Sequence, residues 1–428
     1  MNAVAKSNGG TPGSVSGGVA LPSRPEDGDA KAQITDTMRR WCLQTLGPQL
    51  KAVILTGSLA RNEATWQQTD RGLQFLSDAE FIVILTDNAG IPSRELVTLI
   101  RKGAEEELRN QGIDCKLSFS TVHEWFLRNL GETIFGYELL TCGEVVYGDP
   151  DILPKNARGV AGVSQEDAWR LLANRTVELL EIVPELVDGS AVLSEAAQYR
   201  LTKLYCDMAT SVLVFKQAFV AGYQARATKL CELSSRGVLS DLPFDGSWFA
   251  ELVRRCTDYK VSHSWDGASP FAARDSVEQA ITVLRSLWAW ELAQMHGSTM
   301  PSPDDMLRLH MQKQELKDRL RGWAFAVRRR GFVDSLRHGW RWLRLSRLAS
   351  PRYCVYAAGL NAVSSFKFPV SSTHATGLAQ LETRNSKLET VLNWLPIANL
   401  AVRTAPDEKD LAEAILWNYR EFLVETRA

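Results

Sequence analysis

Short apolar segments that alternate with helical ones constrain the first third of this chain more than any other feature. A segment at residues 92–111 has the pattern of a helix and ends at Gly112. Three segments have the length and composition of strands: residues 52–55 (AVIL), 79–86 (AEFIVILT) and 115–121 (CKLSFST). Apolar strands in alternation with helices predict a layered α/β module, which we place at residues 34–155.

From Ser164 onward, apolar residues recur at three- and four-residue steps, which is typical of amphipathic helices. Further helices are predicted near residues 276–296 and 410–425, and a break rich in Ser and Pro falls at residues 297–305. The clearest apolar stripe consists of Leu201, Leu204, Tyr205, Met208, Val212, Phe215 and Phe219. The predicted fold class is therefore α+β: a mixed sheet with flanking helices, followed by helical domains at 156–300 and 301–428.

Composition excludes several classes of protein. Hydrophobic residues make up 45% of the 428 residues, which is ordinary for a globular protein and excludes a fibrous chain. Lys and Arg number 49 against 50 Asp and Glu, so a globally basic nucleic-acid binder is not indicated. Residues 1–33 are rich in Gly, Ser and Pro and are predicted to be a disordered tail, with a first helix starting near Asp36.

The expected cellular location follows from sequence features that this chain lacks. No apolar run approaches the ~20 residues that span a bilayer, so no transmembrane segment is predicted. The N-terminus lacks the apolar core of a signal peptide. Seven scattered cysteines include no C-x-x-C pair, which favours reduced thiols and a cytoplasmic protein.

Asp78 and Glu80 stand at the start of a strand that is otherwise apolar. Residues two apart on a strand point to the same face, so the two carboxylates are expected side by side. Like charges placed together need compensation, and a divalent cation such as Mg²⁺, bound by carboxylates and phosphate oxygens, can supply it. A solvated turn is the alternative interpretation.

Gly57 and Ser58 follow the strand at residues 52–55 and precede a predicted helix start. Glycine lets the backbone approach a phosphate closely, and a serine hydroxyl and free backbone N–H groups can donate to phosphate oxygens. The alternative is an ordinary turn with an N-cap. The order of the two motifs and their flanking strands favour a joint site.

These residues resemble the DNA polymerase β-type nucleotidyltransferase superfamily, and most of all its minimal and aminoglycoside-type branch. The resemblance covers roughly residues 50–230. It includes CGEVVYGDPD at 142–151, similar to the end of the family's catalytic domain, and residues 199–226, similar to a helix of its C-terminal helical domain. It implies that Gly57 and Ser58 hold the triphosphate of an NTP such as ATP, and that Asp78 and Glu80 are catalytic and hold one or two Mg²⁺ ions.

The implied reaction is transfer of a nucleoside monophosphate from Mg-NTP to an unknown acceptor hydroxyl, with release of pyrophosphate. The family usually adds a third carboxylate on a neighbouring strand. Asp114 and Lys116 alternate on the same face of that strand here, so Asp114 is a candidate catalytic base and Lys116 a candidate phosphate ligand. If Lys116 replaces the acid, a catalytically weak nucleotide-binding regulatory module is the alternative. Residues 65–75 are predicted to be an inserted loop over the site.

Two further features are candidates for anion contacts. Lys203 lies on the long predicted helix, where the resemblance implies a contact with the triphosphate, and an ion pair with Asp207 four residues on is the alternative. Residues 321–352 hold nine Arg, no Lys and one acid, interleaved with Trp. Arg with Trp on a helix suits an anionic membrane surface or a nucleic acid, while a packed helix with internally paired Arg is the third interpretation. An interaction protein that acts through this segment is therefore the other alternative function.

Overall fold

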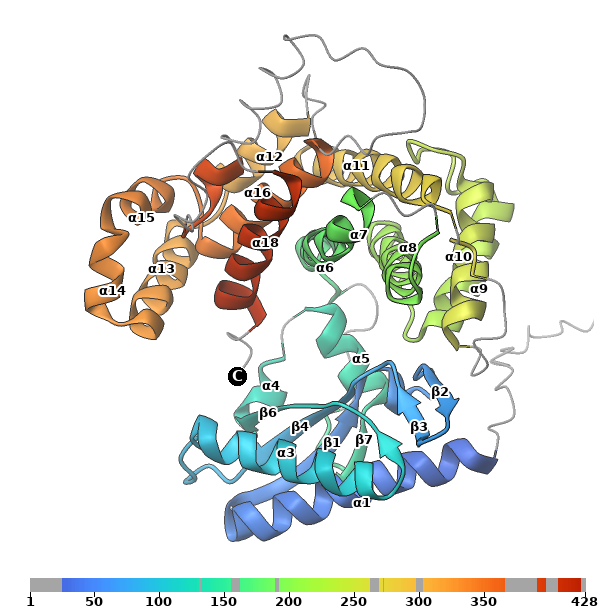
Figure 1. Cartoon of the computed structure of the whole chain (residues 1–428), viewed down its shortest axis with the longest axis vertical. Coiled ribbons are helices and arrows are strands. Elements are labelled where there is room, and N and C mark those ends of the chain that lie inside the picture. Colours follow the sequence, from blue (N-terminus) through green and yellow to red (C-terminus); the bar gives the residue numbers. More distant parts are fainter. Residues whose placement is uncertain are drawn as a thin grey trace, which may run out of the picture.

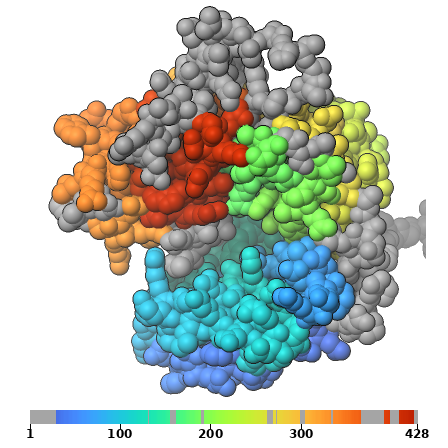
Figure 2. Space-filling model, viewed as in Figure 1, coloured from blue at the N-terminus to red at the C-terminus, as the bar shows by residue number. Residues whose placement is uncertain are grey.

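The computed structural model describes residues 25–130, 132–154, 162–188, 192–261, 269–271, 273–297, 303–365, 391–397 and 407–424. There the chain is a mixed α and β protein, in which an N-terminal module with two small sheets lies beside a larger helical body (Figure 1). In the space-filling view the module, blue to teal, is the lower lobe (Figure 2). The predicted α+β class is confirmed. Residues 1–24 of the predicted tail lie outside the described residues.

The module contains two mixed sheets. A four-stranded sheet has the order β6-β4-β1-β7, with β4 antiparallel to β1 and parallel to β6. The elements of the whole module, in chain order, are α1 (Pro25–Leu46), η1 (Gly47–Gln49), β1 (Leu50–Thr56), α2 (Gly57–Ala60), β2 (Trp66–Thr69), β3 (Gly72–Phe75), β4 (Ala79–Leu85), α3 (Arg94–Asn110), β5 (Ile113–Asp114), β6 (Leu117–His123), α4 (Trp125–Arg128), α5 (Ile134–Cys142) and β7 (Glu144–Tyr147).

Both faces of the four-stranded sheet are covered, which is why β1 and β4 are nearly continuous apolar runs. On one face Val53 and Phe81 pack in a core with residues of α1 and α3. On the other face Ile54 and Ile84 pack against Leu139 of α5 and a residue of α4. The first residues of β4 lie beyond this second core, so polar side chains are tolerated there.

Two sequence expectations need correction. α1 begins at Pro25, well before the expected start near Asp36, so residues 25–33 are helical rather than part of a tail. Residues 65–75 are not a loop, because β2 and β3 form an antiparallel hairpin in which Trp66 pairs with Phe75. β3 also pairs with β5, and this makes the second, three-stranded sheet.

The helical body is built around one continuous core that runs from Ala168 on α6 to Leu423 on η4 and also includes Ile134 of α5. The core therefore crosses the expected break at 297–305 without dividing. The body consists of α6 (Gln165–Leu179), η3 (Leu180–Ile182), α7 (Val183–Val187), α8 (Glu195–Phe215), α9 (Tyr223–Ser235), α10 (Gly246–Val261), α11 (Asp275–His296), α12 (Pro303–Gln312), α13 (Leu316–Arg330), α14 (Phe332–Arg337), α15 (Gly339–Ser346), α16 (Pro351–Ser365), α18 (Glu408–Tyr419) and η4 (Arg420–Val424). None of the helices described has the length and apolar character needed to cross a membrane.

The Arg- and Trp-rich segment is three helices, because the chain breaks at Gly331, where φ is +80°, and at His338. Part of it is packed, as the third interpretation predicted. Arg329 and Arg330 each lie 3.4 Å from a carboxylate oxygen of Glu421. The buried indoles of this segment donate to backbone carbonyls: Trp323 Nε1 to Ala349 at 2.8 Å and Trp342 Nε1 to Pro396 at 2.9 Å.

One buried acid in the helical core predicts a pH-dependent stability. Glu291 on α11 is fully buried; Ser211 Oγ donates to its Oε1 at 2.5 Å, and its Oε2 has no hydrogen-bond partner among the described residues. Burial raises the pKa of Glu291 to about 8, although the Ser211 hydrogen bond opposes the shift. Between the ordinary glutamate pKa and about 8, the folded chain holds a proton that the unfolded chain has lost, so stability falls as pH rises.

We therefore expect the free energy of unfolding of the wild type to fall by about 2–3 kcal/mol between about pH 6 and about pH 9 because of Glu291. Glu291→Gln should remove this fall. Urea unfolding of wild type and variant at both pH values measures this. Glu278→Gln on the same helix is the matched control, because Glu278 lies in the first turn of α11 and is not buried. If the free energy of unfolding changes with pH equally in wild type and Glu291→Gln, Glu291 is not the group that causes the pH dependence.

Candidate functional site

The two sequence motifs meet at the end of strands β1 and β4. The antiparallel register pairs Thr56 with Glu80, so the Gly57–Ser58 turn directly adjoins the Asp78–Glu80 pair. Gly57 has a φ of +73°, and a Cβ added there would lie 3.0 Å from the Glu80 carboxyl carbon. This backbone conformation favours glycine, and any larger residue there would also press on the Glu80 side chain. The helix after the turn, α2, is a single turn rather than a long helix.

Glu80 is the second residue of β4 and Asp78 directly precedes this strand, two residues from Glu80; both residues are exposed. The residues between and after them, Ala79 and Phe81, point into the core with α1 and α3. The carboxylates therefore face the other side, toward α5 and the helical body. Two accessible carboxylates on one face suit a hard cation that takes its remaining ligands from water and phosphate.

The neighbouring strand brings a cation rather than a third acid. Glu80 pairs with Ser118 on β6, and Ala79 N donates to Lys116 O at 2.9 Å, which places Lys116 beside Asp78. Asp114 belongs to β5 in the other sheet, where Arg109 Nε lies 3.8 Å from its Oδ1. The expectation that Asp114 and Lys116 share one strand is wrong, because the chain changes sheets between them.

The charges around Asp78 come from both parts of the molecule. Desolvation by the surrounding protein raises the pKa of Asp78, while the ammonium groups of Lys203 and Lys116 lower it and Glu105 raises it further. Lys203 belongs to α8 of the helical body, whereas Lys116 adjoins β6 of the module. The carboxylate pair therefore lies at the junction of the two parts.

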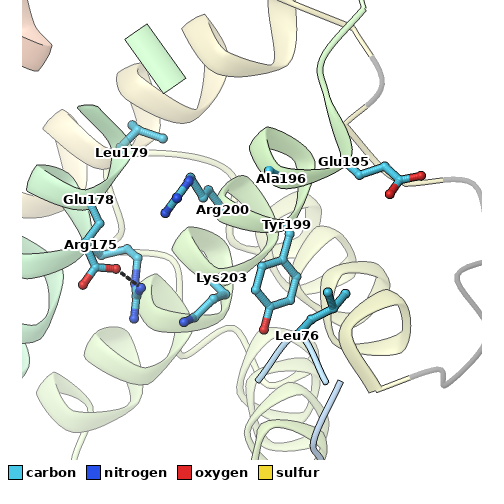
Figure 3. Close-up of a pocket in the computed structure, with 9 residues that line it drawn as sticks. All are labelled: Leu76, Arg175, Glu178, Leu179, Glu195, Ala196, Tyr199, Arg200 and Lys203. Atoms are coloured by element: carbon cyan, nitrogen blue, oxygen red, sulfur yellow. Dashed lines mark hydrogen bonds and ion pairs between the residues drawn. The ribbon is translucent and has the colours of Figure 1, made fainter. Parts of the chain in front are cut away.

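A cavity of about 400 Å³ opens at this junction, next to the chain that leads into β4 (Figure 3). Leu76 contributes from the module, and the rest of the wall comes from the helical body. Besides Leu76, the lining residues are Arg175, Glu178, Leu179, Glu195, Ala196, Tyr199, Arg200 and Lys203. The wall carries three cations and a phenol, groups that contact phosphate and nucleotide rings, together with two carboxylates. Arg200 is paired with Glu181, which lies outside the lining.

Lys203 is available for such a contact. The predicted alternative, an ion pair with Asp207, does not form, because Arg175 Nε donates to Asp207 Oδ2 at 2.7 Å. Within the described chain, no carboxylate lies within 4 Å of the Lys203 ammonium, which instead lies 5.8 Å from the centroid of the Tyr199 ring. Arg175 is also paired with Glu178, as Figure 3 shows.

A second lysine, which is buried, interacts electrostatically with the Tyr199 phenol. Lys260 on α10 is 2% exposed, and its Nζ lies 3.4 Å from Thr65 Oγ1 and 4.5 Å from the centroid of the Tyr223 ring. Burial raises the pKa of Tyr199, but Lys260, Lys203 and the hydrogen bonds with Ser77 and Thr65 together lower it, so the net shift is downward. The Tyr199 hydroxyl lies 3.5 Å from Ser77 Oγ, next to Asp78.

Buried charges join the module to the helical body beside this cavity. Arg61, just after α2, pairs with Glu63 at 3.0 Å and with Glu138 of α5 at 3.1 Å. Arg226 on α9 pairs with the other oxygen of Glu138, and Gln224 N donates to Glu63 Oε1 at 3.0 Å. All four charged side chains are at most 15% exposed. This network positions the Gly57–Ser58 turn against α8 and α9.

Comparison of this chain with family models, with curated proteins and with solved structures finds no match. No group of three or more His, Cys, Asp or Glu side chains in the described part of the chain is placed to hold a metal ion. Asp78 and Glu80 alone would supply the protein ligands for Mg²⁺, a donor set that fits an ion shared with substrate phosphates.

Several residues of the site were missed by sequence reasoning. Tyr199 could have been found, because it precedes Lys203 by four residues and therefore shares its helical face. Arg175 and Lys260 carry no such signal, since α6 and α10 meet the site only through helix packing. Lys116 and Lys203, predicted as phosphate ligands, both lie near Asp78.

Proposed function

We propose that this protein is a Mg²⁺-dependent nucleotidyltransferase that moves a nucleoside monophosphate from an NTP to an acceptor hydroxyl. The observation that carries the proposal is the register of β1 and β4, which sets the Gly57–Ser58 turn against Asp78 and Glu80 beside a cation-lined cavity. In the reaction the acceptor hydroxyl loses its proton to water and its oxygen bonds to the α-phosphorus, the bond to the bridging oxygen breaks, and pyrophosphate leaves.

Each residue has a role in this proposal. Asp78 and Glu80 would hold Mg²⁺, which when bound supplies positive charge to the phosphates and the leaving group. Gly57 and Ser58 would contact phosphate through the backbone and the hydroxyl. Lys116 and Lys203, which both lie near Asp78, would contact phosphate oxygens. The cavity wall around Tyr199 would receive the nucleoside or the acceptor.

A nucleotide-binding module without efficient transfer is the second candidate, and a specific observation favours it. Beside Asp78 and Glu80 lie Lys116, just before β6, and Ser118 on β6, rather than a carboxylate that can take the acceptor's proton. Asp114 lies in the other sheet beside Arg109. Incubation with each labelled NTP, Mg²⁺ and candidate acceptors, scored for pyrophosphate, separates the two: transfer releases it, whereas a binding module retains Mg-NTP unchanged.

Lys203 supplies a sharp test of the nucleotide site. We expect Lys203→Ala to weaken Mg-NTP binding by about 10–100-fold, because it removes one charge-assisted contact to phosphate. Isothermal titration of Mg-NTP measures the change. Lys229→Ala on α9 is the control, since Lys229 is paired with Glu232 on the surface. If both variants bind Mg-NTP as wild type does, Lys203 does not contact the triphosphate.

A further inference from the structure

We propose that the surface of α14 and α15 binds an anionic membrane. We call it the Trp340 surface and define it by six residues: Leu336, Arg337, Trp340, Leu343, Arg344 and Arg347. Figures 1 and 2 show α13–α15, in orange, at the outer margin of the helical body, so attachment there leaves the candidate site open. The proposal does not depend on nucleotidyl transfer.

The apolar part of the surface is large and unprotected. Trp340 is 88% exposed, Leu336 63% and Leu343 49%. Trp340 and Leu343 lie three residues apart on α15 and therefore share one helical face, and Leu336 lies near the end of α14, the helix just before it. By contrast Trp323 and Trp342 of the same segment are buried in the core. Exposed aromatic and aliphatic side chains grouped in this way mark an interaction site.

The charge around these apolar residues points to an anionic partner. Residues 321–352 hold nine Arg and one acid. Some of these Arg side chains face inward: Arg329 and Arg330 pair with Glu421, and Arg341 donates to the Leu395 carbonyl. Arg337, Arg344 and Arg347 are exposed. Among the described residues, no carboxylate lies within 4 Å of Arg344 or Arg347; Arg344 donates only to the Asn393 carbonyl, at 3.2 Å.

The composition of the surface favours lipid over nucleic acid. Single-stranded nucleic acids are held by successive aromatic side chains that stack on bases. Here one tryptophan is flanked by two leucines, which cannot stack but can enter the boundary between headgroups and acyl chains. Trp is suited to that boundary because its ring is apolar and its N–H is polar. Arg at the rim then faces lipid phosphates.

The test uses the full chain and sedimentation with vesicles. We expect binding to phosphatidylcholine vesicles that contain phosphatidylserine, no binding to phosphatidylcholine alone, and weaker binding as salt is raised. Trp340→Ala should weaken binding at least about tenfold, because its apolar ring would no longer be buried. Trp125→Ala is the control: Trp125 is 56% exposed on α4 of the module, and its loss should change nothing.

Charge variants provide a second measurement. Arg344→Gln and Arg347→Gln should each weaken binding to phosphatidylserine vesicles about fivefold, since each basic residue near an anionic surface contributes about that factor. Asp78→Asn should bind vesicles as wild type does, which separates this proposal from the nucleotide site. Failure of wild type to bind phosphatidylserine vesicles, or equal binding by Trp340→Ala, overturns the proposal. Trp340-dependent binding of single-stranded RNA without vesicle binding also overturns it.

Discussion

Replacing Asp78 with Asn, or Glu80 with Gln, is expected to lower kcat/KM for NTP turnover by at least about a thousandfold. Either change removes a carboxylate from the proposed Mg²⁺ site and with it stabilisation of charge that develops on the transferred and leaving phosphates. Both side chains are exposed and both replacements keep the size of the side chain, so the fold should persist. Pyrophosphate release measures turnover, and thermal unfolding checks the fold.

Asp114→Asn is the matched control for these variants. Asp114 lies in the second sheet near Arg109, so turnover should stay within about twofold of wild type if the residue only makes this exposed ion pair. Unchanged turnover and Mg-NTP binding in an Asp78→Asn, Glu80→Gln double variant contradicts the site. If Asp114→Asn alone loses turnover, the catalytic carboxylate is Asp114 on β5 instead.

Arg226→Met is expected to lower the free energy of unfolding by about 3–5 kcal/mol, the usual cost of removing one partner from a buried ion pair. The side chain is 4% exposed, pairs with Glu138, and donates to Thr210 Oγ1 and Val220 O at 3.0 Å each. Its removal leaves Glu138 with only Arg61 as a described ionic partner. Urea unfolding measures the change.

The control for this variant is Arg236→Met at the end of the same helix. The Arg236 side chain is 63% exposed and pairs with Glu232, so we expect a change of at most about 0.5 kcal/mol. An Arg226→Met, Glu138→Gln double variant should recover part of the loss, because it no longer buries an unmatched carboxylate. A loss of stability in Arg226→Met no larger than in Arg236→Met contradicts a structural role for the network.

The local parts of the site were predictable from the sequence. The two-residue spacing of Asp78 and Glu80 places them on one face wherever the segment forms a strand, because strand side chains alternate. The apolar runs around residues 52–55 and 79–86 predicted β1 and β4 because a short continuous apolar run is typical of a strand buried on both faces. What the sequence did not contain was their register, and only the pairing of Thr56 with Glu80 brings Gly57 to the carboxylates.

Partners of charged side chains were decided by the tertiary structure. Sequence spacing allowed Lys203 to pair with Asp207, but α6 packs against α8 and Arg175 takes that carboxylate. Asp114 and Lys116 were expected on the same face of one strand, but the chain passes from one sheet to the other between them. Helices and strands follow from side chains a few residues apart. Ion pairs and cavity walls depend on long-range packing, because a charge withdrawn from water must pair with whichever partner the fold brings near.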